Sequence, residues 1–277
     1  MRRSRKPGQH PYAWMLGVLA RGVGLLFVAP VLWMVLTSLH SEGDAATNPP
    51  SVGAKLTMAG YREFFDSNPW PALINSATAA IVSALLVLAL ATPAAYALSI
   101  RPVRKWSDVM FFFLSTKFLP AVAALLPVYL IAKNLQLLDN IMALVLIYAA
   151  MNLPIAVWMM RSFLVELPRE MLEAAELDGA RLPTLMRRII LPLTAPGLAA
   201  TSLICFIFSW NELMFARVLT STVAGTSPVF LTGFITSEGL FLAKLCAAAM
   251  VVSLPVLIAG FAAQDELVQG LSLGAVK

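Results

Sequence analysis

Long apolar runs separated by short polar segments dominate the chain. Six of these runs approach or reach the roughly 17–25 residues that a helix needs to cross a bilayer, so they predict six spanning helices. The runs are Gly22–Leu39, Leu73–Ser99, Val109–Ala132, Ile141–Met160, Leu193–Ala216 and Leu245–Ala263. The third run is interrupted by Lys117, Pro120 and Pro127. The predicted fold class is an all-α membrane protein with six transmembrane helices.

The segment before the first run is basic and is interpreted separately. Residues 1–21 begin with "MRRSRK" and include a short apolar stretch up to Arg21 that is compatible with an interfacial position. The first run is not expected to be a cleaved signal, because it is long and no small-residue cleavage pattern follows it. Neither an internal repeat nor a low-complexity linker is evident, so residues 22–277 are predicted to form one six-span domain.

Composition supports a membrane protein and excludes other classes. The chain of 277 residues is 59% hydrophobic and 13% charged, whereas soluble domains average about 45–50% and about 25%. The net charge of +5 is scattered between apolar runs, so nucleic acid is not an expected partner. Cys205 and Cys246 lie inside apolar runs and are predicted to be packing residues. His10 and His40 are far apart, so no metal site is expected.

Basic residues are distributed unequally between the two sides of the predicted membrane. With the N-terminus inside, the inner segments carry fourteen Lys and Arg and the outer segments five. Cytoplasmic loops carry an excess of such residues, so both termini are predicted to be cytoplasmic. The inner set is Arg2, Arg3, Arg5, Lys6, Arg21, Arg101, Arg104, Lys105, Arg161, Arg169, Arg181, Arg187, Arg188 and Lys277, and the outer set is Lys55, Arg62, Lys133, Arg217 and Lys244.

A polar segment lies between the fourth and fifth runs, on the predicted cytoplasmic side. Its sequence, "EAAELDGARLPTLMRRIILPLTAPG", predicts two short helices joined by a bend. Pro168 suits the first turn of a helix, and Gly179 suits the left-handed cap that ends one. Pro183 suits the start of the second helix.

Small and acidic residues of the first short helix suit contact with another protein. Ala174 and Ala175 have little bulk, so another surface can approach the backbone closely. The carboxylates of Glu173, Glu176 and Asp178 can pair with basic groups on that surface. A solvated amphipathic helix explains these residues equally well.

The spacing of this segment resembles the EAA loop of ABC-importer permeases. The matching positions lie within residues 161–192. In that family the loop forms a coupling helix that docks in a cleft of the ATP-binding subunit. The resemblance implies ATPase-coupling roles for Glu173, Ala174, Ala175, Glu176, Asp178, Gly179, Ile189, Leu191 and Pro192.

Other segments, from about Tyr61 onward, resemble the maltose-permease-like branch of carbohydrate importers. They are "INSATAAIVSALLVLALATPAAYALS", "PVYL", "SWNELMFARVLT" and "QGLSLGAVK". Residues 115–130 and 237–249 are most similar to sorbitol/mannitol permeases, which implies a polyol or sugar substrate. By the same resemblance, the tail is expected to insert between two ATP-binding subunits, with a disordered terminus as the alternative. The tail residues concerned are Gly274, Ala275, Val276 and Lys277.

The resemblance also implies partners. These are a second six-span permease subunit in a heterodimer, two ATP-binding subunits, an exported solute-binding protein, the sugar or polyol, and membrane lipid. The chain has no G-x-x-x-x-G-K-[ST] phosphate loop, so it is expected to bind no cofactor itself, with ATP and Mg held by the partner ATPase subunits. It is therefore predicted to be a transport subunit and not an enzyme.

Polar residues within the runs are candidates for a substrate path, because an ionisable group at membrane depth is costly. Lys117 either faces that path or extends its ammonium to the interface. The ring of Trp210 and the polar groups of Asn211 and Glu212 suit the C–H face and hydroxyls of a polyol. An interfacial anchor role for Trp210, and structural roles for its two neighbours, remain equally open. Lys244 is expected to extend toward the outer surface.

Two other function classes fit less well. An ion-coupled secondary transporter predicts inverted repeats with matching broken helices, and no such symmetry is evident. A membrane-embedded enzyme needs clustered ligands or a nucleophile–base pair, and no catalytic residue is predicted. The favoured function is a pore-forming permease subunit of an ATP-driven importer in the bacterial inner membrane.

Overall fold

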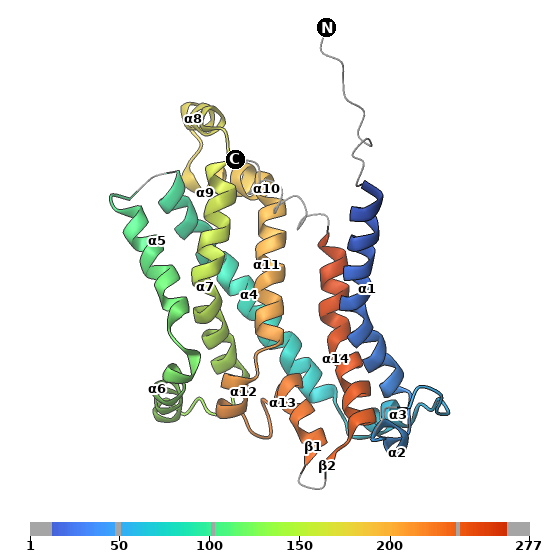
Figure 1. The fold of residues 1–277 in the computed structure, drawn as a ribbon. Coiled ribbons are helices and arrows are strands. Elements are labelled where there is room, and N and C mark those ends of the chain that lie inside the picture. The colour runs from blue at the N-terminus through green and yellow to red at the C-terminus, as the bar shows by residue number, and fades with distance from the viewer. Residues whose placement is uncertain (1–12, 48–50, 101–102, 237–238, 265–277) are drawn as a thin grey trace. The chain divides into compact units, whose positions relative to one another are not determined.

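The computed structural model describes residues 13–47, 51–100, 103–236 and 239–264, which are almost entirely helical (Figure 1). The predicted all-α class is confirmed, with one pair of two-residue antiparallel strands as an addition. The elements in chain order are α1 (Ala13–Ser38), α2 (Glu42–Ala45), α3 (Ala59–Asp66), α4 (Trp70–Ser99), α5 (Trp106–Ser115), η1 (Thr116–Phe118), α6 (Ala121–Asn134), α7 (Ile141–Val165), α8 (Arg169–Leu177), α9 (Leu182–Leu185), η2 (Met186–Ile190), α10 (Leu191–Leu193), α11 (Ala195–Trp210), α12 (Met214–Leu219), α13 (Ser227–Leu231), η3 (Thr232–Phe234), β1 (Ile235–Thr236), β2 (Gly239–Leu240) and α14 (Leu242–Ala262).

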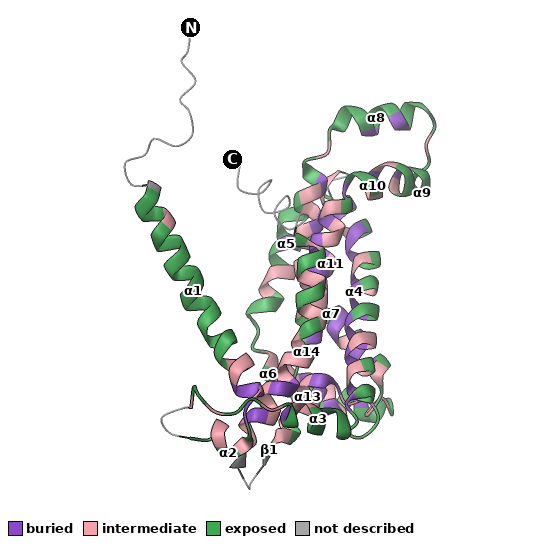
Figure 2. Ribbon diagram, turned by 90° about the vertical axis from the view of Figure 1, so that its right-hand side faces the viewer, coloured by how far each residue is buried: buried purple, intermediate pink, exposed green. Residues whose placement is uncertain are grey.

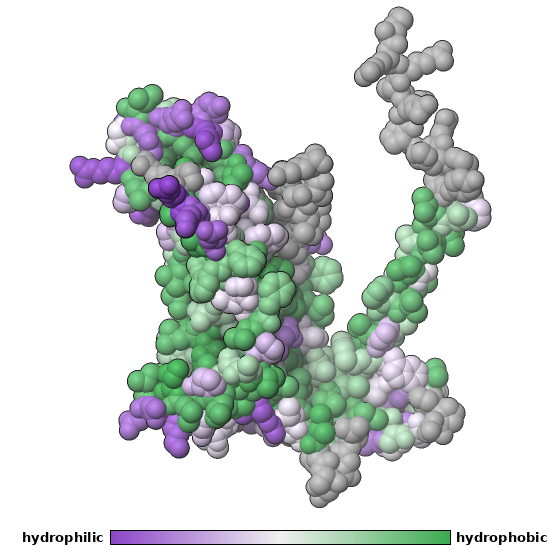
Figure 3. Space-filling view, turned by 60° about the vertical axis from the view of Figure 1, so that its left-hand side comes forward, coloured by the Kyte–Doolittle hydropathy of each residue, from purple (hydrophilic) through white to green (hydrophobic). Residues whose placement is uncertain are grey.

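The chain forms two compact units, each described by itself. The smaller unit comprises Met1–Ser67 and Phe234–Val251, and the larger unit comprises Asn68–Gly233 and Val252–Lys277. In the larger unit, α8, α9 and α10 lie at one end, and α6, α12 and α13 lie at the other (Figure 1). Figure 3 shows hydrophilic side chains at both of these ends and a hydrophobic band between them.

Four helices among the described residues are long and apolar enough to cross a membrane, namely α1, α4, α7 and α14. Two further pairs of helices pass the same test together, although each pair is bent, so up to six spans are possible. All six predicted runs therefore correspond to helices or helix pairs. Three of them agree with the prediction to within five residues at each end, and the other three differ more in their ends or in their course.

Helix α1 begins earlier than predicted. The first run was expected to start at Gly22, after a separate stretch up to Arg21, whereas α1 continues unbroken from Ala13 to Ser38. One arginine does not end an apolar helix, because its long side chain can carry the guanidinium toward water. Most of α1 is exposed in this single chain (Figure 2).

The third run is a broken helix. Its two parts, α5 with η1 and then α6, are bent by 91°. Leu119 has an extended backbone with ψ 124°, because the proline that follows disfavours a helical conformation in the residue before it. Pro120 thus separates the two parts, and the α-helix is interrupted between η1 and α6.

The fifth run is also bent, and it ends earlier than predicted. The segment Leu182–Leu193 meets α11 at 79°, next to Thr194. Helix α11 stops at Trp210, where prediction extended the span to Ala216. The chain leaves the helix at residues 211–213 and re-enters it in α12, whose first turn is capped by Glu212.

The core of the larger unit is built from small side chains. Helices α4 and α7 pack along each other and against α11. Buried alanines at their contact permit close approach, which is how helices associate when lipid is as apolar as the protein. These are Ala84, Ala91, Ala95, Ala149 and Ala156.

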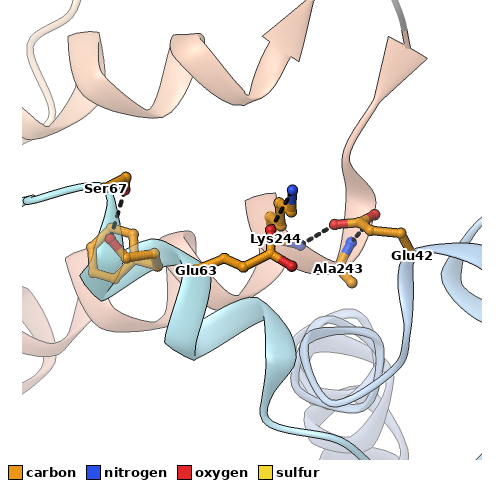
Figure 4. A network of polar contacts seen from close by, with 6 residues as sticks. Glu42, Glu63, Ser67, Ala243 and Lys244 are labelled. Carbon is orange, nitrogen blue, oxygen red and sulfur yellow. Dashed lines mark hydrogen bonds and ion pairs between the residues drawn. The ribbon is translucent and has the colours of Figure 1, made fainter.

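Polar contacts join α2, α3 and the start of α14 within the smaller unit (Figure 4). The Glu42 carboxylate accepts hydrogen bonds from the backbone N–H groups of Ala243 and Lys244, at 3.1 and 2.8 Å. The side chain of Lys244 forms an ion pair with Glu63 and lies 4.7 Å from the centre of the Phe241 ring. Lys244 therefore has protein partners, where prediction expected only extension toward the outer surface.

Gly197 provides a test of the α7–α11 packing. A Cβ atom at this position would overlap the Phe163 ring. We expect Gly197→Ala to lower the free energy of unfolding by about 1–3 kcal/mol, because overpacking displaces neighbouring side chains. Thermal unfolding of the purified protein in detergent measures this.

Two control variants sharpen the test. Gly22→Ala in α1 places its methyl group in open space and should leave the unfolding temperature within error of wild type. Adding Phe163→Ala to Gly197→Ala should cost less than the two single effects summed. Simple additivity of the two changes would contradict the packing described.

Candidate functional site

Helix α8 and its bend have the conformation predicted from sequence. Pro168 immediately precedes the helix, and Gly179 follows it with φ +80°, a left-handed conformation that glycine adopts at little cost. The N–H of Gly179 donates to the carbonyl of Glu176, and that of Ala180 to the carbonyl of Ala175, both at 3.0 Å. This pair of bonds is a Schellman motif, which ends the helix firmly.

The two faces of α8 differ in their surroundings (Figure 2). Leu172 and Ala175 are buried, with exposed fractions of 4% and 8%. Glu173 and Ala174 are exposed, and Leu177 is 89% exposed. Of the two alanines predicted to face a partner, only Ala174 is accessible, whereas Ala175 packs inward.

The inner face of α8 belongs to the hydrophobic core that α4, α5 and α7 also form. Leu172 and Ala175 belong to the same cluster as Leu98 of α4, Met110 of α5 and Leu164 of α7. A displacement of α8 therefore acts on a hydrophobic cluster that also includes residues of α4, α5 and α7.

The remainder of the loop is anchored in a similar way. Residues 186–190 form a turn of π-helix, closed by a bond from the N–H of Leu191 to the carbonyl of Met186. Ile190 is fully buried, Ile189 and Leu191 are half-buried, and Pro192 is exposed. Of the nine predicted coupling residues, six are accessible, namely Glu173, Ala174, Glu176, Asp178, Gly179 and Pro192.

A stacking contact that the sequence did not predict lies at the same end. The guanidinium of Arg161 lies 3.8 Å from the centre of the Trp106 ring, and its Nε donates to the carbonyl of Leu98 at 3.3 Å. This one side chain of α7 thus links the ends of α5 and α4. The sequence analysis counted Arg161 only as a topology signal, because its partners are 55 and 63 residues away.

A polar network lies inside the helical core. The Ser209 hydroxyl of α11 is 3.0 Å from the Ser83 hydroxyl of α4, and it accepts a 3.0 Å hydrogen bond from the Asn152 amide of α7. All three side chains are buried. The network joins the three core helices side chain to side chain.

The predicted substrate-path residues have different surroundings. Trp210 is 3% exposed, and its indole N–H donates to the carbonyl of Val252 at 3.1 Å. The Asn211 side chain is exposed and donates to the carbonyl of Ile207. Glu212 accepts the N–H groups that begin α12. Lys117 is exposed in η1, beside the break in the third run.

The predicted ATPase-contacting tail, 274–277, lies outside the described residues. Within the described ranges, no three His, Cys, Asp or Glu side chains gather as a metal site.

A second anchored loop lies at the end opposite α8, and sequence analysis did not find it. The carboxylate of Asp139 accepts the backbone N–H groups of Ser221, Thr222, Val223 and Ala224. Burial alone would raise the pKa of Asp139, but these four donors outweigh it and lower the pKa to about 2. An unfolded aspartate has a pKa of about 3.9, so this stabilisation is complete above that value and is lost as the pH falls through 2.

Comparison with known proteins places these features in a family. Residues 88–271 match the family described as "Binding-protein-dependent transport system inner membrane component". A probable ABC transporter permease protein of Sinorhizobium fredii is 38% identical over 92% of this chain and 92% of its own length. A trehalose transport system permease protein of Mycobacterium tuberculosis is 31% identical over 96% of this chain and 97% of its own.

A solved structure agrees in fold. It is described as a bacterial ABC transporter involved in the import of the acidic polysaccharide alginate, and it superposes with a TM-score of 0.75 at 22% identity, over 94% of this chain and 99% of that one. This likeness shows that the two chains share a fold. The chain belongs to the binding-protein-dependent transport system inner membrane component family.

Asn152 tests the buried network. We expect Asn152→Ala to lower the free energy of unfolding by about 1 kcal/mol or somewhat more, in the range of interhelical hydrogen bonds within membranes. Ser202→Ala is the matched control, because the Ser202 hydroxyl bonds only to the Ala199 carbonyl of its own helix. Equal shifts in unfolding temperature for the two variants would show that the network contributes nothing specific.

Proposed function

We propose that this chain is the pore-forming permease subunit of an ATP-driven importer that moves a sugar or polyol across the bacterial inner membrane, with α8 as its coupling helix. The observation that carries the proposal is the two-sided nature of α8. Its exposed side carries Glu173, Ala174 and Glu176, and its buried side belongs to the hydrophobic cluster that includes residues of α4, α5 and α7. A solvated amphipathic helix also carries exposed small and acidic residues, so the resemblance of this loop to the EAA loop is what favours the coupling role.

The distribution of arginine residues indicates which end of the larger unit faces the cytoplasm. The segments at the α8 end include Arg161, Arg169, Arg181, Arg187 and Arg188, and such an excess favours the cytoplasmic side. An ATP-binding subunit on that side can reach α8 directly. The partner subunits hold ATP and Mg, because this chain has no phosphate loop.

The mechanism follows from the rigidity of the loop. Closure of the two ATP-binding subunits displaces α8, and the contacts of Leu172 and Ala175 transfer that displacement to three helix ends. The Schellman motif at Gly179 and the Arg161 contacts limit local bending. The bundle consequently rotates as one body, which changes the side of the membrane to which the path opens.

The family description supports a solute-binding protein as a partner, since transport in this family depends on one. A second six-span permease completes the path, in a heterodimer with two ATP-binding subunits. The tail at 274–277 is proposed to contact those ATP-binding subunits.

The proposed substrate class is carbohydrate. Relatives at about 30% identity are described as permeases for trehalose, for trehalose and maltose, and for diacetylchitobiose. The finer assignment to a polyol such as sorbitol or mannitol rests on residues 115–130 and 237–249 alone. Among the path residues, Asn211 and Lys117 are accessible to a solute, whereas Trp210 is enclosed by protein.

Coupling is tested with two variants in the reconstituted importer. Glu173→Lys reverses a charge on the exposed face of α8, and Gly179→Asp strains the left-handed bend. Each is expected to reduce ATP-driven uptake at least tenfold without lowering the amount of protein in the membrane. Vesicle uptake and quantitative blotting measure the two quantities.

The matched control is Glu166→Lys, an exposed carboxylate that ends α7 outside α8. It should retain uptake within about twofold of wild type. Full uptake by both α8 variants would rule out the coupling role. Uptake by this chain alone in liposomes, without any ATPase, would support an ion-coupled secondary transporter instead.

Substrate class is tested by the ATPase activity of the complete complex with its binding protein, across a panel of polyols and sugars. We expect stimulation by at least one member, and a changed concentration dependence in Asn211→Ala if that residue lines the path. Stimulation by sugars but never by sorbitol or mannitol would refute the polyol assignment. Unchanged dependence in Asn211→Ala would leave that residue with a structural role.

A further inference from the structure

The turn at residues 220–225 is held by a single carboxylate. The oxygens of Asp139 accept four consecutive backbone N–H groups, from Ser221 to Ala224, at distances between 2.8 and 3.2 Å. The Thr222 hydroxyl donates to the same carboxylate at 3.3 Å. An ionised carboxylate has lone pairs enough for all of these donors, and bonds to a charged acceptor are about twice as strong as neutral ones.

The same turn is also fastened to α4. The Asn75 amide donates to the carbonyls of Val223 and Gly225, at 2.8 and 3.0 Å. The Ser76 hydroxyl accepts the N–H of Ser227 at 2.8 Å. Asp139 itself donates its N–H to the carbonyl of Leu219. The turn is therefore fixed on both sides to the helical core.

The turn at residues 220–225 has a small exposed surface. Val223 is 72% exposed, and Ser221 and Thr222 are also exposed, whereas Ala224 is buried. A structure that needs only to cap the core would bury its one large apolar side chain here. A surface turn held rigid before binding costs less conformational entropy when a partner docks.

The position of the turn indicates which partner it meets. It lies with α12 and α13, at the end of the larger unit opposite α8 (Figure 1). If α8 faces the cytoplasm, as proposed above, the turn faces the side from which an exported binding protein delivers its solute. The family is defined by dependence on such a protein.

We propose that Asp139 is a positioning residue that holds the turn at 220–225 in the conformation with which the permease receives the solute-binding protein. Val223, Ser221 and Thr222 make the contact, and Asp139 acts through the backbone beneath them. This inference rests on the proposed function for its orientation and its partner.

The test measures ATPase activity of the reconstituted complex as its binding protein, loaded with substrate, is titrated. Asp139→Asn leaves one acceptor oxygen and places an amide N–H₂ against N–H donors. We expect the half-saturating concentration of the binding protein to rise about tenfold, a loss of about 1.4 kcal/mol, with the saturated rate within twofold of wild type. Asp139→Glu, which keeps the charge, should recover part of that loss.

Two further variants complete the experiment. Val223→Arg alters the exposed surface without removing any bond to Asp139, and it should raise the half-saturating concentration by a similar factor even where Asp139→Asn does not fold. Asp66→Asn is the control, an exposed aspartate of α3 for which no side-chain bond occurs among the described residues. It should match wild type.

The outcomes separate this inference from the proposed function. A wild-type complex that the binding protein does not stimulate would refute the proposed function itself. Normal stimulation, with an unchanged half-saturating concentration in Val223→Arg and in any folded Asp139→Asn, would overturn the inference alone. A lower saturated rate at an unchanged half-saturating concentration would also overturn it, because that pattern indicates a defect within the bundle.

Discussion

Close packing of α4 against α7 is the interaction on which the remaining structure depends. Lipid offers no hydrophobic driving force between helices, so this contact relies on dispersion between small side chains and on a few hydrogen bonds. Ala91 and Ala156, both fully buried, allow the backbones to approach, and Asn152 adds a polar tie to α11. Larger residues at the alanine positions would separate the two helices.

The two ends of this bundle are fastened by different chemistry. At the α8 end, Leu172 is buried in the hydrophobic cluster, and Arg161 of α7 stacks on Trp106 of α5. At the opposite end, a carboxylate gathers backbone donors of a turn. Burial tolerates small sliding movements, whereas charge-assisted hydrogen bonds demand a fixed geometry.

Local signals in the sequence predicted local structure well. Apolar runs located every spanning helix or helix pair, and Gly179 predicted the end of α8, because each of these depends on residues within a few positions. The break at Pro120 was visible in the sequence, but its 91° angle was not, since the angle depends on packing against other helices. The contacts of Asp139 with residue 221 and of Ser83 with Ser209 join positions 82 and 126 residues apart. The spacing of apolar residues along the chain does not predict contacts at such separations. The role of Trp210 could not be predicted for the same reason. From the sequence, an aromatic residue near the end of a span suits the membrane interface as well as a substrate path, and only the structure shows its hydrogen bond to Val252.

The cap that Glu42 provides for α14 has a consequence for biogenesis. The donors it satisfies, at Ala243 and Lys244, are translated about 200 residues later. Until then Glu42 lacks the backbone N–H groups that it accepts from α14, and Glu63 lacks the Lys244 ammonium with which it forms an ion pair. Glu42 and Glu63 consequently gain these contacts only after the start of α14 has been made, so the smaller unit completes its polar contacts late in synthesis.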